Sequence, residues 1–427
     1  MLRFGSGCIT KFRKHWVILF VLLGASVIYF KLPLRLQAME PYAYAAAIEG
    51  YYDLSQSFSV AQGYPLPNFS RYHPNHPLGH ALLGAVYDLF SVPALEGMFF
   101  LNMVSILISA VFLYLLCLYF NFKPLAAALT SALFLSSYVS LFAVFSGEFH
   151  APALALAMGG VWQACVFIDT WKKKALWYAT LFFTCASVYH LDALFLTILM
   201  GFFVLYYVVK EKQFHAVIFP FLFFIISLII FYILIPVYKF HLHSVDDFFK
   251  YFFIYVHKDA LQFSVFAWLW AMHRTMLDAA VFVIPITEIV LKASVAFWVI
   301  FLWKAICFWK NTVREKSTKM APFIFASGVL VYAILGVRPD GLLGWLYLIP
   351  FLFIFVFNSA RNTNAWFLSL HLVVVLAILS WNILFAIWPN SIQRDSDRFF
   401  FDLPREISKD SPIAFVIGGD PVLMHSE

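Results

Sequence analysis

Long apolar runs recur along most of this chain, and they constrain its fold more than any other feature. An α-helix needs about 20 mostly apolar residues to cross the ~30 Å hydrocarbon core of a bilayer. Within that core each backbone N–H and C=O must be paired internally, as a helix pairs them. Of the 427 residues, 63% are hydrophobic and only 12% are charged, with a mean hydropathy of +0.84. The sequence therefore predicts an all-α polytopic membrane protein without a large soluble domain.

The runs predict about eleven membrane-spanning helices. They cover 16–30, 97–119, 124–145, 150–170, 175–189, 191–210, 214–237, 281–308, 320–337, 342–358 and 366–388. The first is expected to be an uncleaved signal anchor, because basic residues precede it and no small-residue cleavage site follows. We expect residues 1–388 to form one transmembrane module.

Two stretches outside the spans have predicted roles of their own. Residues 31–96 form a long first outer loop, in which 39–54 and 78–90 are predicted to be helices lying along the membrane interface. Residues 389–427 form a tail on the outer face that is too short for an independent domain.

Basic residues orient the predicted spans. Short loops rich in Lys and Arg face the cytoplasm, and the clusters here fall on one side of the layout, at 11–14, 123, 172–174, 210–212, 310–319 and 361. The formal charge of +6 is therefore explained by basic cytoplasmic loops, and nucleic acid is not an expected partner. The five cysteines are odd in number and scattered, mostly inside apolar runs, which argues against a disulfide framework.

Acidic, imidazole and guanidinium side chains gather at the turns on the opposite, outer side. The set comprises Glu40, His73, His76, Glu148, His150, His190, Arg338 and Asp340. Polar groups from several separate turns at one end of a membrane domain predict a common cavity at the membrane surface.

The acid after the first span, Glu40, precedes Pro41 at the start of the predicted interfacial helix. Its carboxylate could act as a general base that takes a proton from an acceptor hydroxyl. Alternatively it is a helix N-terminal acid stabilised by the helix dipole. Position alone leaves both roles open.

A histidine-rich loop contains His73, His76 and His80, spaced three and four residues apart. On a continuous helix this spacing would suit a metal ion, but Pro74 and Pro77 interrupt the helix. We therefore predict no metal site there. His73 and His76 are expected to donate to phosphate oxygens, with His80 inside the following helix.

The remaining candidates are pairs of groups at later outer turns. Glu148 with His150, and His190 followed by Asp192, could orient a sugar hydroxyl or form solvated turns. Arg338 could clamp a phosphate or pair with Asp340 in its own turn. None of these pairs decides between the alternatives alone.

Four places together resemble a known family. They are Glu40-Pro-Tyr-Ala-Tyr-Ala, the loop from His73 to Gly79, the acid Glu148, and His190 with the late segment Gly341-Leu-Leu-Gly-Trp-Leu-Tyr-Leu-Ile-Pro350. The chain resembles the GT-C class of integral-membrane glycosyltransferases, which use polyprenyl-phosphate sugars and include protein mannosyltransferase and aminoarabinose transferase relatives. It departs from the class in two respects: Glu40 stands where members commonly have Asp, and the tail lacks a sizeable outer domain.

The resemblance implies a reaction. A sugar would pass from a polyprenyl-phosphate carrier to a hydroxyl of a glycan, lipid or protein acceptor, with inversion. Glu40 would be the base, Arg338 with His73 or His76 would hold the phosphate, and no nucleotide, nicotinamide or flavin is implied. Relatives differ in their use of a divalent cation, so the metal requirement stays open. The implied location is a bacterial inner membrane, with the site on the periplasmic face.

Two other functions remain open. One is a lipid-linked sugar transporter or flippase, and the other is an inactive relative that binds lipid or a partner. Alternating-access transporters favour polar groups near the bilayer midplane and often contain repeats. The gathering of polar groups at one face favours the enzyme.

Overall fold

The computed structural model describes residues 15–31, 48, 77–145, 149–240, 244, 277, 279–281, 319–335, 342–357 and 365–388. All regular structure in these ranges is helical, which confirms the all-α class. The α-helices are α2 (Trp16–Lys31), α5 (Pro77–Phe90), α6 (Ala94–Tyr119), α7 (Pro124–Ser136), α8 (Tyr138–Phe145), α9 (His150–Thr170), α10 (Lys173–Tyr189), α11 (Asp192–Lys210), α12 (Ile218–Ile229), α13 (Ile235–Phe240), α18 (Met320–Leu335), α19 (Ile349–Phe357) and α20 (Ala365–Asn382).

Several helices are long and apolar enough to cross a membrane. In the described part of the chain these are α6, α9, α11 and the continuous stretch Ile218–Tyr238, with the bent pair α7–α8 as a fifth. Only 17% of the apolar window in Ile218–Tyr238 is buried, and Phe219 and Phe221 point outward, 70% and 61% exposed. In water such a surface would be unstable, so it is a lipid-facing surface. The chain is an integral membrane protein.

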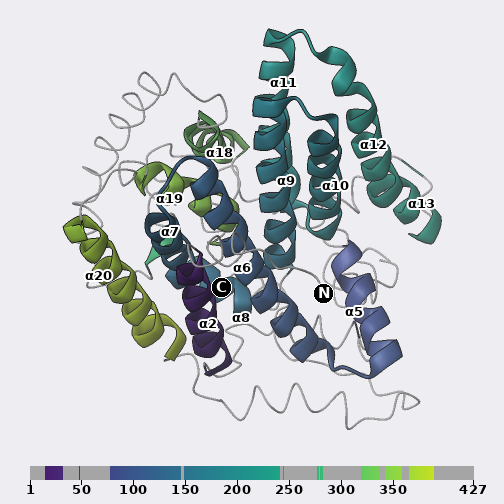
Figure 1. Cartoon of the computed structure of the whole chain (residues 1–427). Helices are drawn as coiled ribbons and strands as arrows, with labels where there is room; N and C mark the ends of the chain where they lie inside the picture. The colour runs from purple at the N-terminus through teal and green to yellow at the C-terminus, as the bar shows by residue number, and fades with distance from the viewer. Residues whose placement is uncertain are drawn as a thin grey trace, which may run out of the picture.

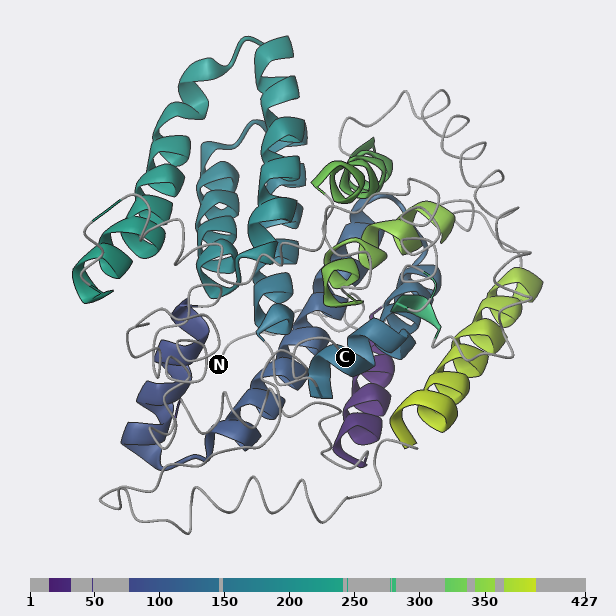
Figure 2. The same ribbon diagram turned by 180° about the vertical axis from the view of Figure 1, so that it is seen from behind.

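The helices pack into two neighbouring groups (Figures 1 and 2). In one group, α9, α10 and α11 stand side by side, and α12 packs on α10. In the other, α7 contacts α2, α19 and α20, while α6 packs against both α7 and α9 and so joins the groups. Polar contacts tie the second group together: the Tyr29 hydroxyl donates to the carbonyl of Leu135 at 2.6 Å, and Asn382 Nδ2 donates to the carbonyl of Ser136 at 2.9 Å.

The predicted single span 124–145 was wrong in one respect, because it is broken into α7 and α8 with a bend of 60°. At the break Ser137 has an extended backbone, with φ −65° and ψ 147°. Its Oγ donates to the carbonyl of Phe134 at 2.7 Å and lies 3.0 Å from Ser140 Oγ. A serine hydroxyl that bonds nearby groups competes with the helical hydrogen-bond ladder, and hydropathy does not register this competition.

Two other predicted spans are irregular. The segment 342–358 begins as a 3-10 helix (Leu342–Tyr347) before α19. Pro350 lies in the first turn of α19, where its missing N–H leaves no intrahelical hydrogen bond unmade. A proline at this position could not continue an α-helix from the preceding segment. The segment 214–237 contains a short 3-10 turn (Phe214–Ala216) and a π-helical stretch (Ile230–Leu234) between α12 and α13.

The helix predicted at 78–90 is confirmed as α5, and His80 lies inside it as expected, fully buried. Its position along the membrane interface stays a prediction. Of the other interfacial helix, 39–54, only Ile48 is described, and it is helical and buried. The span 281–308 beyond residue 281 and the tail 389–427 lie outside the described residues.

Candidate functional site

The eight predicted site residues divide into two sets. His150 and His190 are described, and the structure brings them into direct contact. The other six lie outside the described residues: Glu40, His73, His76, Glu148, Arg338 and Asp340. Their roles remain predictions.

His150 is the first residue of α9, and the preceding Phe149 is fully buried. Pro152 fits the first turn because its missing N–H would have no intrahelical partner there. Gly79 of α5 lies against the Phe149 ring, and a Cβ at Gly79 would lie only 2.7 Å from a ring carbon. The His80 ring also contacts Phe149, with ring centroids 5.3 Å apart. The helix after the histidine-rich loop thus helps to position the start of α9.

His190 separates α10 from α11. Its extended backbone, with φ −153° and ψ 131°, ends α10. Its Nδ1 then accepts a hydrogen bond from the backbone N–H of Asp192 at 3.2 Å, at the first residue of α11. Asp192 is well placed there because a carboxylate is favoured at a helix N-terminus.

The corner around His190 is braced from two neighbouring helices. Ser187 Oγ lies 3.2 Å from Thr197 Oγ1, which joins α10 to α11. The Tyr232 hydroxyl, from the π-helical stretch after α12, donates to the backbone carbonyl of Ser187. Both contacts are buried, and they hold the last turn of α10, just before His190.

His150, His190 and Asp192 form a compact polar cluster. The two imidazole rings have centroids 3.7 Å apart and planes inclined by 32°. Asp192 Oδ2 lies 3.6 Å from His150 Nδ1 and 4.0 Å from His190 Nδ1. One carboxylate oxygen therefore faces the Nδ1 atoms of both rings.

Burial differs sharply within this cluster. The two histidines are only 5% and 6% exposed, whereas the Asp192 side chain is 50% exposed. On the side of His150, the Tyr347 hydroxyl lies 3.4 Å from Nδ1 and 3.5 Å from the backbone carbonyl oxygen of the same residue. Tyr347 therefore covers the cluster on the side of His150, and the Asp192 carboxylate is the part accessible from outside.

Such an arrangement can act in two chemical ways. Imidazoles can donate to or accept from a polar ligand that enters beside Asp192. Imidazole nitrogens with a carboxylate oxygen are also a ligand set for a transition-metal ion, and one ligand atom from each of the three residues lies within 4.8 Å of the others. Within the described residues these are the side chains that could hold a metal ion.

Sequence reasoning missed Tyr347 and did not include Asp192 among the site residues. The interval of two residues between His190 and Asp192 was visible, but a turn acid is commonly solvated. Tyr347 offered a weaker signal: it is a tyrosine in the late segment that carried part of the family resemblance. Its contact with His150 spans 197 residues of sequence, which no local pattern could indicate.

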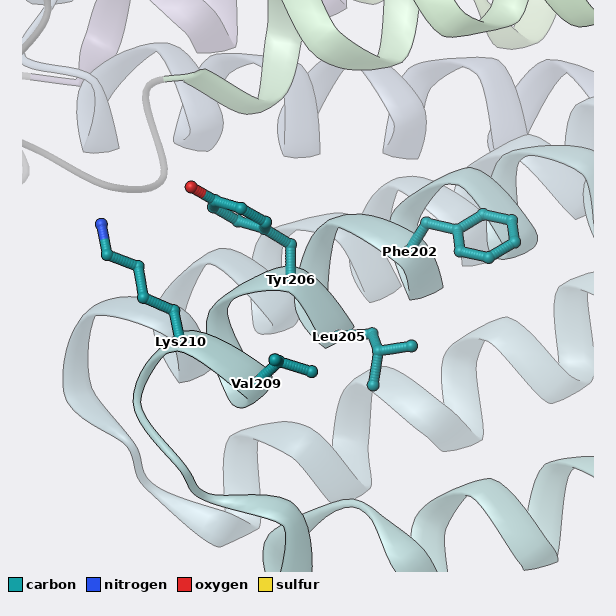
Figure 3. A pocket seen from close by; sticks show the side chains of 5 residues that line it. All are labelled: Phe202, Leu205, Tyr206, Val209 and Lys210. Atoms are coloured by element: carbon teal, nitrogen blue, oxygen red, sulfur yellow. The ribbon is translucent and has the colours of Figure 1, made fainter.

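A shallow apolar hollow lies away from this cluster (Figure 3). Phe202, Leu205, Tyr206, Val209 and Lys210 of α11 line it, and its volume is about 500 Å³. These residues occupy the C-terminal half of α11, whereas Asp192 begins the helix. We regard the hollow as part of the lipid-facing surface.

Solved structures with a similar fold are known. The chain is similar to the crystal structure of ArnT from Cupriavidus metallidurans in the apo state, with a TM-score of 0.58 and 14% identity, over 91% of this chain and 68% of that one. It is similarly close to ArnT from the same organism bound to undecaprenyl phosphate, with a TM-score of 0.57, 14% identity and the same coverage. No protein-family model and no curated protein sequence matches the chain.

The likeness in fold extends over 91% of this chain, although only 14% of the aligned residues are identical. The chain therefore has the polytopic all-helical fold of ArnT, as its resemblance to the GT-C glycosyltransferases predicted.

Proposed function

We propose that this chain is a GT-C-type glycosyltransferase that moves a sugar from a polyprenyl-phosphate carrier to an acceptor hydroxyl, with inversion, at the outer face of a bacterial inner membrane. The observation that carries the proposal is the ArnT fold over 91% of the chain, with one of the two similar structures bound to undecaprenyl phosphate.

The polar cluster supports the proposal. His150, His190 and Asp192 lie at the ends of α9, α10 and α11 opposite the basic residues that follow α9 and end α11. The positive-inside rule assigns those basic ends to the cytoplasm, so the cluster belongs to the outer side. An outer polar site is where a carrier phosphate at the membrane surface would meet an acceptor.

In the proposed reaction Glu40 takes the proton from the acceptor hydroxyl, whose oxygen attacks the anomeric carbon. The bond from that carbon to the phosphate oxygen breaks, and polyprenyl phosphate leaves. Arg338 with His73 or His76 stabilises the departing phosphate charge. Glu148, His150, His190 and Asp340 line the substrate cavity and orient sugar hydroxyls.

A turnover assay tests the proposal. The purified chain is placed in vesicles with a panel of radiolabelled polyprenyl-phosphate sugars and candidate acceptors. We expect protein-dependent release of polyprenyl phosphate in step with labelled acceptor. Movement of intact donor between leaflets without release would instead identify a flippase. Donor binding without movement or release would identify an inactive relative.

Labelling of introduced cysteines tests the orientation. With the native cysteines replaced, a cysteine at position 75 is expected to react with a membrane-impermeant reagent added from the periplasmic side. A cysteine at position 315, in the basic stretch, should react only after the membrane is opened. Equal protection of both positions would show that the two segments share a side, which would overturn the layout.

A further inference from the structure

We infer that the apolar hollow on α11 binds one anionic phospholipid, whose acyl chain lies along the helix and whose phosphate meets Lys210. The hollow is at the opposite end of α11 from Asp192, and so at the opposite end of the helix group from His150 and His190. The inference therefore goes beyond the proposed sugar transfer and does not depend on it.

The apolar wall of the hollow fits one acyl chain. Phe202, Leu205 and Val209 are spaced three and four residues apart, so they form one stripe along α11. They are 61%, 44% and 50% exposed. At 1.5 Å per residue the stripe from 202 to 210 is roughly 12 Å long, which is most of the depth of one leaflet, half of the ~30 Å hydrocarbon core. A chain that descends from the membrane surface can therefore lie against the whole stripe.

One end of the hollow carries polar groups that suit a phosphate. The Tyr206 hydroxyl and the Lys210 ammonium both lie at this end, and Phe202 lies at the other (Figure 3). Lys210 is in the last turn of α11, where a lysine extends its ammonium into the headgroup layer while its methylene chain stays on apolar surface. The ammonium offers a charged donor to a phosphate oxygen, and the hydroxyl can donate to a phosphate or ester oxygen.

The wall of the hollow is held in place by packing behind it. The Tyr206 ring meets the buried Tyr207 ring edge to face, with centroids 5.1 Å apart. Tyr207 in turn contacts Phe203 at 5.3 Å, and Phe203 contacts Phe323 of α18 at 5.3 Å. This row of rings fixes one side of the hollow before a lipid arrives, so binding orders few protein groups.

The charge around the hollow selects an anionic headgroup. Residues 169–174 and 210–213 form the ends of α9, α10 and α11 on this side, and they contain exposed lysines at 172, 173, 174, 210 and 212 against the acids Asp169 and Glu211. Asp169 already accepts a hydrogen bond from the Tyr119 hydroxyl at 2.6 Å. Basic segments at a membrane surface attract anionic lipids. A zwitterionic lipid carries its own cation beside the phosphate and is attracted less.

Photo-crosslinking in vesicles tests the inference. The full chain is placed in phosphatidylcholine vesicles that contain a small fraction of phosphatidylglycerol with a photoreactive group in its acyl chain. After illumination the labelled residues are mapped by mass spectrometry. We expect stronger labelling at 202–209 than at Leu372 and Val373, which are exposed on α20 and report non-selective lipid contact. Unlabelled phosphatidylglycerol should displace the label, and the same amount of additional phosphatidylcholine should not.

Variants separate the headgroup contact from the acyl-chain contact. Lys210→Gln should lower the labelling of 202–209 about fivefold, the usual effect of one basic side chain near an anionic lipid surface. Leu205→Trp should lower it too, because the larger ring fills the hollow without changing the charge. The matched control is Lys31→Gln, which removes an exposed lysine from the last turn of α2 and should leave the labelling unchanged. All three positions are exposed, so the unfolding temperature in detergent should stay native and exclude misfolding.

Four results would overturn the inference. One is equal labelling of 202–209 by a phosphatidylcholine probe, which would mean non-selective lipid contact. Another is native labelling in Lys210→Gln. A third is an equal loss in Lys31→Gln, which would mean that charge acts without a local site. The fourth is displacement by less polyprenyl phosphate than phosphatidylglycerol, which would identify the sugar carrier as the occupant.

Discussion

Replacing Glu40 by glutamine is expected to lower the rate of polyprenyl-phosphate release by about 100-fold or more. The amide keeps the size and hydrogen-bonding shape of the carboxylate, but it cannot accept the proton of the acceptor hydroxyl. General-base catalysis contributes typically 10²–10⁴-fold. The measurement is the initial rate of release from the labelled donor at saturating acceptor.

Two further variants separate the proposed base from a purely structural acid. Glu40→Asp should retain much of the rate, because related enzymes commonly place Asp at this position and either carboxylate can take a proton. Glu96→Gln should leave the rate unchanged, because Glu96 is an exposed acid in the first turn of α6 and tests only the helix-dipole role. Equal rates for the native chain and Glu40→Gln would exclude Glu40 as the base.

Replacing Gly160 by leucine is expected to destabilise the protein by about 1–3 kcal/mol or more, the usual range for overpacking a core. Gly160 lies on α9 where α10 packs against it. A Cβ there would stand 2.8 Å from two atoms of the Phe183 ring and 3.0 Å from Cγ, close to the base of that side chain. Since Phe183 is itself buried, the ring cannot swing into open space, and α9 and α10 must separate. The midpoint of thermal unfolding in detergent reports the effect.

The control for this substitution is Gly201→Leu in α11. Nothing lies within 4 Å of a Cβ at Gly201, so the same change should leave the midpoint unchanged or raise it slightly, because glycine is a poor helix former. A native midpoint in Gly160→Leu would show that the two helices are not tightly packed at this point.

Hydropathy was a reliable guide to where the described helices lie, because a bilayer imposes the same requirement on every span. It placed α6, α9, α10 and α11 within a few residues of their observed bounds. It failed where a local hydrogen bond or a proline competes with the helix. The hydroxyl of Ser137 broke 124–145 into two helices, and the late segment began as a 3-10 turn before Pro350.

The candidate site was likewise predicted from the sequence only in part. The sequence predicted that His150 and His190 share one end of the helices, because basic residues lie at the other ends of α9 and α11. It could not predict that their rings would touch, or that the Asp192 carboxylate would face both of them. Such contacts depend on the rotation of each helix about its axis, and distant packing such as Gly160 against Phe183 sets that rotation.

By itself, then, the sequence determined the membrane and the all-helical class, because length and hydropathy act locally along the chain; the side of each polar turn stays a prediction from charge. Only the tertiary structure decided which polar groups meet. The convergence of His150, His190 and Asp192, closed by Tyr347 from nearly 200 residues away, results from helix packing, in which segments remote in sequence become neighbours only after the apolar faces have fitted together.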